Sequence, residues 1–177
     1  MSIHKKIIYA CCLLMAFNST VALAQTCQTA TIPATTPSSR FTVPGNGTVT
    51  DTKTGLMWKQ CSEGLSGADC SVGGAGAYTW QGALQQAQTV NANGGFAGYS
   101  DWRVPNVKEL RSITERQCYD PTINVAVFPH TVSSLYWSSS PVANYSGYAW
   151  NVSFGYGHDH WYDKNFSYYV RLVRSGQ

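Results

Sequence analysis

The chain has 177 residues, with 12 lysines and arginines against 9 acidic residues and a formal net charge of +3. Without the first 24 residues, which contain Lys5 and Lys6, 10 basic residues would face 9 acidic ones, a net charge of +1. This near-balance lacks the strong basic excess of nucleic-acid-binding proteins, so we expect no nucleic acid partner. A chain of this size is expected to form one domain with one core.

The first 24 residues have the pattern of a secretory signal peptide. Lys5 and Lys6 form a positive start, residues 7–17 are a short apolar run, and Ala22-Leu23-Ala24 fits a small-x-small cleavage site. The sequence therefore predicts cleavage after Ala24 and export to the periplasm, the cell surface or the medium. Because no other apolar run approaches about 18 residues, we expect no membrane span in the mature chain.

Four cysteines remain after the signal peptide: Cys27, Cys61, Cys70 and Cys118. In an exported chain, four cysteines predict two disulfides, which could form in three pairings. Cys61 and Cys70 close a short loop rich in glycine and serine, so we favour that pair, which leaves Cys27 with Cys118. A zinc site is disfavoured because the sequence has no C-x-x-C motif.

The N-terminal half predicts a lead-in, a hairpin and a helix. Residues 25–44, rich in Thr, Pro and Ser, look like a loosely ordered lead-in to a domain at 45–177. Residues 48–51 and 56–59 are expected to form a hairpin, followed by a glycine-rich loop at 62–77. The stretch TWQGALQQAQTVN (79–91) predicts a helix that is capped by Thr79 and ended by residues 93–95. Its apolar stripe is Trp80, Ala83, Leu84, Ala87 and Val90.

A second helix is expected after Pro105. Asn106 is a suitable N-cap, Glu109 would complete a capping box, and Leu110 and Ile113 would form the buried face. The preceding Trp102 is expected in the core. Three arginines, which we interpret as ion-pair partners or backbone anchors, are Arg103, Arg171 and Arg174.

The C-terminal third is expected to consist of strands and loops. Residues 136–138 predict a short strand, and residues 168–174 predict the last strand. Between them, Trp150, Val152 and Phe154 alternate with Asn151 and Ser153, as expected for a half-buried strand with its aromatic side facing the core.

Residues 155–165, GYGHDHWYDKN, raise the question of a metal or catalytic site. In an extended backbone His158 and His160 would share a face, and Asp163 could be a third ligand of zinc or copper. This metal-dependent hydrolase or metal-binding protein is kept as an alternative. The sequence has no G-x-S-x-G motif and no EF-hand loop, so we expect no catalytic residue, no cofactor and no enzyme.

The strongest signal is the composition of residues 144–169. These 26 residues contain six Tyr, two Trp and two Phe, and 19 of them are Tyr, Ser, Asn, Gly, His or Asp, as in antibody contact surfaces. The alternative is an ordinary aromatic core beside a polar loop. The predicted ligand-binding residues are Tyr145, Tyr148, Asn151, Ser153, Tyr156, His158, Asp159, His160, Trp161, Tyr162, Asp163, Asn165 and Tyr168.

Six motifs follow one another along the chain: DTKTGLMW (51–58), SDWRVPNVKEL (100–110), FPHT (128–131), YWSSSP (136–141), AWNVSFGYG (149–157) and YVRLVR (169–174). In this order they resemble the Lcl C-terminal domain family, also called DUF1566. The resemblance implies an α+β, C-type-lectin-like fold with two helices, a small twisted antiparallel sheet and long loops. It also implies a bacterial exported or surface module. Some members are terminal domains of adhesins that contact sulphated glycans and can be homotrimers.

We therefore expect a secreted, non-enzymatic recognition or adhesion module that binds a glycan or a protein. A structural envelope protein is a further alternative. Related domains are diversified by retroelements that mutate adenines, and from an AAC codon this reaches Tyr, Ser, Asp, His, Gly and Phe, which describes much of 144–169. Trp161 and Lys164 are outside that set. Flanking DNA with no reverse transcriptase and no template copy would exclude this hypothesis.

Overall fold

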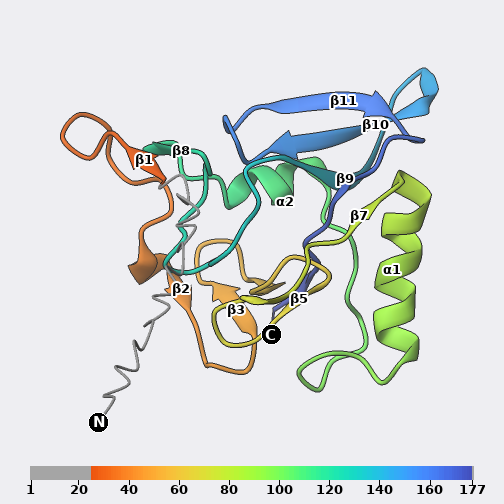
Figure 1. The fold of residues 1–177 in the computed structure, drawn as a ribbon, viewed down its shortest axis with the longest axis horizontal. Helices are drawn as coiled ribbons and strands as arrows, with labels where there is room; N and C mark the ends of the chain where they lie inside the picture. Colours follow the sequence, from red (N-terminus) through yellow and green to blue (C-terminus); the bar gives the residue numbers. More distant parts are fainter. Residues whose placement is uncertain (1–24, 177) are drawn as a thin grey trace, which may run out of the picture.

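The computed structural model describes residues 25–176 (Figure 1). The expected signal peptide, residues 1–24, lies outside the described residues. In chain order the elements are β1 (Thr26–Cys27), the 3-10 helix η1 (Ser38–Arg40), β2 (Phe41–Thr42), β3 (Thr48–Asp51), β4 (Leu56–Lys59), β5 (Leu65–Ser66), β6 (Val72–Gly73), β7 (Ala77–Tyr78), α1 (Trp80–Ala92), α2 (Val107–Ser112), β8 (Cys118–Tyr119), β9 (Leu135–Val142), β10 (Tyr145–Ser153), β11 (Asp159–Asp163), β12 (Tyr168–Tyr169) and β13 (Val173–Ser175).

The strands form two main sheets and two small ribbons, in a mixed α/β fold. The larger sheet has the order β11-β10-β9-β12-β7, the second has the order β13-β4-β3-β2, and β1-β8 and β5-β6 are two-stranded. The expectation of one small antiparallel sheet was wrong. The stretch 168–174, expected as one strand, joins the larger sheet through β12 and the second sheet through β13, and β12 runs parallel to β9.

Both helices begin at the expected caps, and α1 ends before Asn93, as expected. The Thr79 side chain accepts a hydrogen bond from the backbone N–H of Gly82 at the start of α1. At α2, the Asn106 side chain accepts from Glu109 N–H, and the Glu109 carboxylate accepts from Asn106 N–H. Each cap satisfies backbone donors that the first helical turn leaves without a partner.

The larger sheet is buried on both faces over its central part. On one face, Leu110 of α2 packs into a core with Val152 and Phe154. On the other face, Ala83 and Ala87 of α1 pack into a second core that includes Trp137 and Ala149. Figure 1 shows α2 against β9 and β10, and α1 near β7 at the other side of the sheet. The alternation along β10 therefore sends side chains into two cores.

A buried arginine joins the two sheets. Arg171 lies between β12 and β13, and its guanidinium donates to the carbonyls of Lys59 and Gln60 and to the hydroxyls of Ser62 and Thr131. It also stacks on the ring of Phe128, 4.9 Å from its centroid. Burial lowers the pKa of Arg171 to about 10, so the side chain is still charged at neutral pH.

The other arginines of the family-like motifs form ion pairs, as expected. Arg103 binds the carboxylate of Glu109 through two nitrogens, at 2.7 Å each. Arg174 binds Asp101 at 2.7 Å, and Trp102 between these partners is buried. These residues hold the segment before α2 against β13 and are scaffold residues.

The N-terminal segment is anchored, in contrast to the loosely ordered lead-in that its composition predicts. The carboxylate of Glu115 accepts hydrogen bonds from the backbone N–H and hydroxyl groups of both Thr35 and Thr36. Phe41 of β2 is buried in the core beside Phe128. Long-range contacts, which composition does not report, order this segment.

Both expected disulfides are present. Cys61 pairs with Cys70, nine residues away, and Cys27 pairs with Cys118, 91 residues away. The first closes the loop that contains β5. The second fixes the N-terminal segment to β8, where Thr26 and Cys27 also pair with Tyr119 and Cys118 across two strands.

We predict that Arg171→Ala lowers the free energy of unfolding by about 3 to 5 kcal/mol, because it removes the buried guanidinium that donates to two carbonyls and two hydroxyls. Arg171→Lys should also destabilise, since an ammonium cannot span the same acceptors. Urea unfolding measures both. Arg116→Ala, at an exposed arginine, is the control and should change stability by no more than about 0.5 kcal/mol. Equal small effects at both positions would contradict the role of Arg171.

The two disulfides should differ in their contribution to stability. Removing the long-range pair (Cys27→Ala with Cys118→Ala) should cost about 2 kcal/mol more than removing the short-range pair (Cys61→Ala with Cys70→Ala). The reason is that loop-closure entropy grows with the logarithm of the closed length, 91 against 9 residues. Urea unfolding of the two double variants gives the difference. A larger loss from the short loop would contradict this account.

Candidate recognition surface

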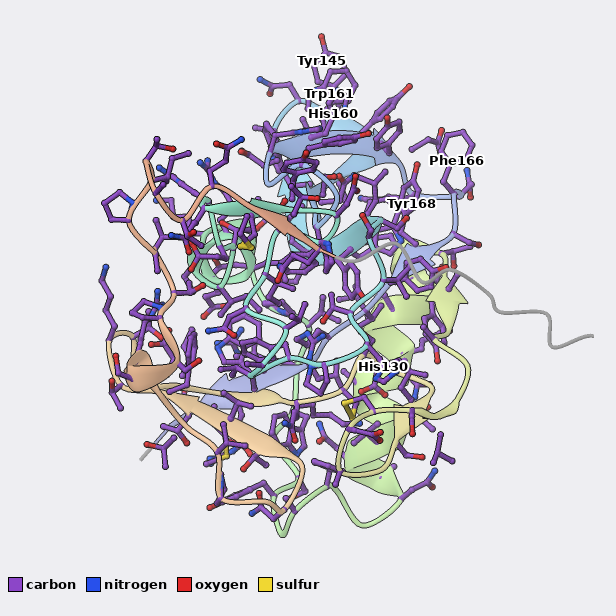
Figure 2. All side chains as sticks on the ribbon, turned by 60° about the vertical axis from the view of Figure 1, so that its left-hand side comes forward. His130, Tyr145, His160, Trp161, Phe166 and Tyr168 are labelled. Atoms are coloured by element: carbon purple, nitrogen blue, oxygen red, sulfur yellow. A yellow bond between two sulfur atoms is a disulfide. The ribbon has the colours of Figure 1, made fainter. Side chains whose placement is uncertain are left out.

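The residues expected to contact a ligand gather on the hairpin of β10 and β11, at the edge of the larger sheet. The two strands pair antiparallel, with Tyr148 opposite Asp163, Trp150 opposite Trp161 and Val152 opposite Asp159. In Figure 1 the hairpin lies at the top of the molecule, and in Figure 2 Tyr145, His160 and Trp161 extend from that end. We call this end the aromatic hairpin: Tyr145, Tyr148, His160, Trp161, Tyr162, Phe166 and Tyr168.

One face of the aromatic hairpin has three rings in mutual contact. Trp161 packs edge-on against Tyr148, with 5.2 Å between ring centroids, and lies parallel to Tyr145 at 6.2 Å. Tyr145 is 59% exposed and Trp161 is 41% exposed. Further along β10, α2 covers this same face of the sheet. The three rings therefore lie on the part of the face that the helix does not reach.

The opposite face carries a second group of rings. Tyr162 lies 4.8 Å from His160, 5.4 Å from Tyr168 and 6.2 Å from Phe166, measured between ring centroids. Tyr168 in turn contacts the buried Trp137 at 5.0 Å, which fixes the group to the core. Burial, followed by the neighbouring Tyr162, raises the pKa of the Tyr168 hydroxyl, so it is neutral at physiological pH.

The turn after β11 is fixed by Lys164. Its backbone N–H donates to Gly147, and its ammonium donates to the carbonyl of Ser146 and lies 4.2 Å from the centroid of the Trp80 ring. The side chain of Asp163 accepts from the N–H of Asn165. The aromatic hairpin is therefore fixed to the core through Tyr168 and to the start of β10 through Lys164.

Two residues expected on the exposed face are buried. Asn151 is 0% exposed and Ser153 is 5% exposed, because the sheet is covered on both faces at this part of β10. Trp150, expected in the core, is half-buried. Neither amide atom of Asn151 has a hydrogen-bond partner among the described residues. The expectation that Asn151 and Ser153 face a ligand was wrong.

The remaining expected residues occupy the surface around the hairpin. Tyr156 is 73% exposed and its ring is parallel to that of His158. Asp159 forms an ion pair with Arg111 of α2 at 2.9 Å. Phe166, 56% exposed, belongs to the surface but was not expected from the sequence, because it lies in a turn without strand alternation. The available signal was the position of Phe166 within residues 144–169, which are rich in tyrosine and tryptophan.

The residues of the metal alternative do not converge. Within β11, His160 and Asp163 are three residues apart and so point to opposite faces of the strand. Figure 2 shows His130 well away from His160. Over residues 25–176, no group of three or more His, Cys, Asp or Glu side chains is arranged to hold a metal ion. The geometry therefore gives the metal alternative no support.

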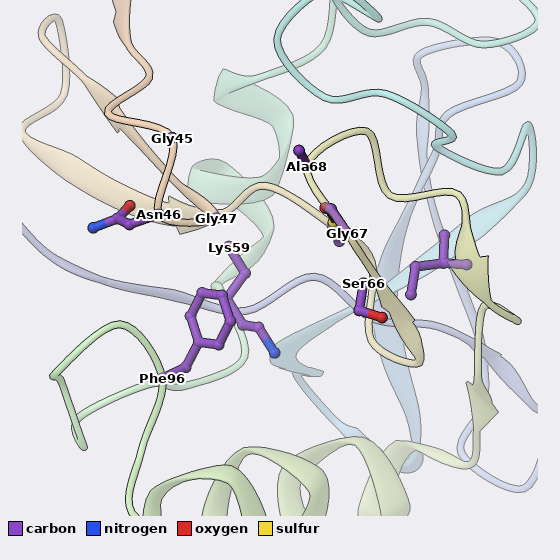
Figure 3. A pocket seen from close by; sticks show the side chains of 10 residues that line it. Gly45, Asn46, Gly47, Lys59, Ser66, Gly67, Ala68 and Phe96 are labelled. Atoms are coloured by element: carbon purple, nitrogen blue, oxygen red, sulfur yellow. Dashed lines mark hydrogen bonds between the residues drawn. The ribbon is translucent and has the colours of Figure 1, made fainter.

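A separate concavity of about 350 Å³ lies elsewhere, between the loop before β3, the β5 loop and the segment after α1 (Figure 3). Lys59 forms part of its wall, with its ammonium 2.6 Å from the carboxylate of Glu63 and 4.6 Å from the centroid of the Phe96 ring. The charges of Lys59 and Glu63 therefore neutralise each other. No residue expected to bind a ligand lines this concavity.

The fold and the surface together define a disulfide-bonded, mixed α/β module that presents exposed aromatic side chains on one edge hairpin. The chain belongs to the Lcl C-terminal domain family, whose model matches residues 47–174. A comparison with curated proteins finds no match to this chain. This match confirms the family resemblance that the sequence motifs indicated.

We predict that Asn151→Leu raises the free energy of unfolding by about 1 kcal/mol, because it replaces a buried amide without partners by an apolar group of similar size. Thermal or urea unfolding measures the change. Asn165→Leu, at an exposed position, is the matched control and should change stability by no more than about 0.5 kcal/mol. A clear loss of stability in Asn151→Leu would show that the amide has partners in solution.

Proposed function

We propose that this protein is a non-enzymatic recognition module that binds a glycan or a protein through the aromatic hairpin. The observation that supports it best is the exposure of large rings at the edge of the larger sheet: Tyr145 and Trp161 on the strand pair and Phe166 in the turn that follows are 41–59% exposed. Folded proteins seldom leave such a group of rings in water without a partner.

The chemistry of these side chains suits recognition. Tyr and Trp offer a large rigid area at a low entropy cost and can also form hydrogen bonds. Tyrosine and tryptophan are enriched among the residues that dominate binding energy at protein interfaces. Ring contacts on both faces of the hairpin hold these side chains before any ligand arrives, which reduces the entropy that binding must offset.

Export is consistent with the rest of the chain. Two disulfides are typical of proteins that fold in an oxidising compartment. Among residues 25–176, neither helix has the length and apolar character needed to cross a bilayer. Within this proposal the mature protein acts outside the cytoplasm, at the cell surface, in the periplasm or in the medium.

The finer fold and assembly are also proposals. Two helices that pack against a set of mainly antiparallel strands support a C-type-lectin-like arrangement, as the family resemblance implies. The resemblance also implies a possible homotrimer, for which mass measurement in solution is the test. If residues 144–169 are diversified, variation should avoid Asn151 and Ser153, because both are buried.

We predict that the double variant Trp161→Ala/Tyr162→Ala loses at least tenfold in binding on a glycan array, because it removes one ring from each face of the hairpin. Tyr119→Ala is the matched control: Tyr119 is 43% exposed and lies on β8, outside the hairpin. It should bind as the unchanged protein does.

Two results would contradict the proposal. Full binding by the double variant would show that the contact surface lies elsewhere. Equal loss in the double variant and in Tyr119→Ala would show that the signal depends on general exposed aromatic area and not on the hairpin. Circular dichroism of each variant confirms that the fold is retained.

A further inference from the structure

Within residues 25–176, the outer strand of the larger sheet is open along its length. β11 stands at the end of the order β11-β10-β9-β12-β7, and its one partner strand in this part of the chain is β10 (Figure 1). An edge strand exposes backbone groups that can pair with another strand. The question is which groups β11 presents, and to what kind of partner.

The antiparallel ladder decides which residues face outward. Lys164 N–H donates to Gly147, and Ser153 N–H donates to His158, so residues 158, 160, 162 and 164 direct their backbone groups toward β10. Asp159, Trp161 and Asp163 therefore direct their N–H and C=O groups away from the sheet.

The carbonyls on this edge are partly occupied, but the N–H groups are open. The Nδ1 of His160 lies 2.9 Å from the carbonyl oxygen of Trp161, and because a carbonyl only accepts, Nδ1 must donate. The N–H of Phe166 donates to the carbonyl of Asp163 at 3.1 Å. Among the described residues, the N–H groups of Trp161 and Asp163 have no acceptor. The edge chiefly offers donors to a partner's carbonyls.

The side chains around this edge give it a negative charge. Asp159, Trp161 and Asp163 share one face of β11. Arg111 balances Asp159 at 2.9 Å. Among the described residues, the Asp163 carboxylate has no ion-pair partner and accepts one hydrogen bond, from the backbone N–H of Asn165. A residue that pairs across the edge from Asp163 therefore meets an uncompensated negative charge, which favours Lys or Arg.

A second copy of this chain fits the edge less well. Two copies paired antiparallel about Trp161 would place Asp159 of each opposite Asp163 of the other. The two-fold symmetry would then repeat this like-charge pair twice. Acidic residues on an edge strand are a known means of avoiding self-pairing.

We propose that β11 binds an extended peptide segment of another protein as an added strand, with a Lys or Arg opposite Asp163 and a β-forming apolar residue opposite Trp161. The inference rests on the proposed function and names the ligand class of the same surface. Backbone pairing would supply affinity, and the rings on both faces of the hairpin would contact alternate side chains of the peptide.

The test uses a displayed library of ten-residue peptides and the disulfide-bonded protein. Enriched peptides should be rich in Val, Ile, Thr and Tyr and carry a basic residue. Asp163→Pro and Asp163→Ala both remove the carboxylate, but only proline removes the open N–H, and it leaves the β10 ladder intact. Asp163→Pro should bind a synthetic enriched peptide at least tenfold more weakly than Asp163→Ala does.

An exchange of charges tests the proposed pairing of a basic peptide residue with Asp163. Asp163→Lys should weaken binding of the basic peptide, and a peptide with Glu in place of its basic residue should recover it. Failure of this recovery would overturn the assigned pairing.

Three other results would overturn strand addition. The first is equal binding by Asp163→Pro and Asp163→Ala, with loss only in Trp161→Ala/Tyr162→Ala, which keeps the aromatic hairpin as the site. The second is a library without enriched peptides, while the glycan array still binds. The third is self-association that Asp163→Pro abolishes, measured by sedimentation, which would make a second copy the occupant.

Discussion

The buried guanidinium of Arg171 is the interaction on which the rest of the structure depends. It lies where the chain passes from β12 in the larger sheet to β13 in the second sheet, and it binds the segment that follows β4. Backbone bonds from Lys59 to Leu172 and from Glu63 to Val170 run alongside it. A charge without a carboxylate partner within hydrogen-bond distance is costly to bury, so its acceptors must all be held in place.

The aromatic hairpin extends from this fixed base. Along β10, residues 151–153 are buried, whereas 145–147 are exposed, so the strand passes from the core into solvent within its nine residues. At the buried end, side chains of the two cores pack on both faces of the strand. At the exposed end, the aromatic rings of the hairpin cover the faces that the helices do not reach. The hairpin can thus present Tyr145 and Trp161 to a partner without rearrangement of the fold. One end of β10 therefore belongs to the core and the other end to the candidate recognition surface.

Local patterns predicted the local structure well. The caps at Thr79 and Asn106, the hairpin at 48–59 and the short disulfide loop all depend on neighbours in sequence. The prediction failed at Asn151 and Ser153, where alternation was interpreted as one buried face and one exposed face. Burial by α1 on one side and α2 on the other follows from tertiary packing, and period-2 alternation carries no information about it. The parallel pairing of β12 with β9 joins residues far apart in sequence and was equally hidden.

The account's central claim is that the aromatic hairpin, and no other part of the surface, contacts the partner. NMR chemical-shift mapping tests it most directly, with amide and indole signals followed during titration with the tightest peptide or glycan found. The account predicts that the largest shifts fall on residues 145–148 and 158–168, with Trp58 and Trp102 unchanged in the core. Shifts centred on the concavity beside Lys59 and Phe96, with the hairpin signals unchanged, would contradict it.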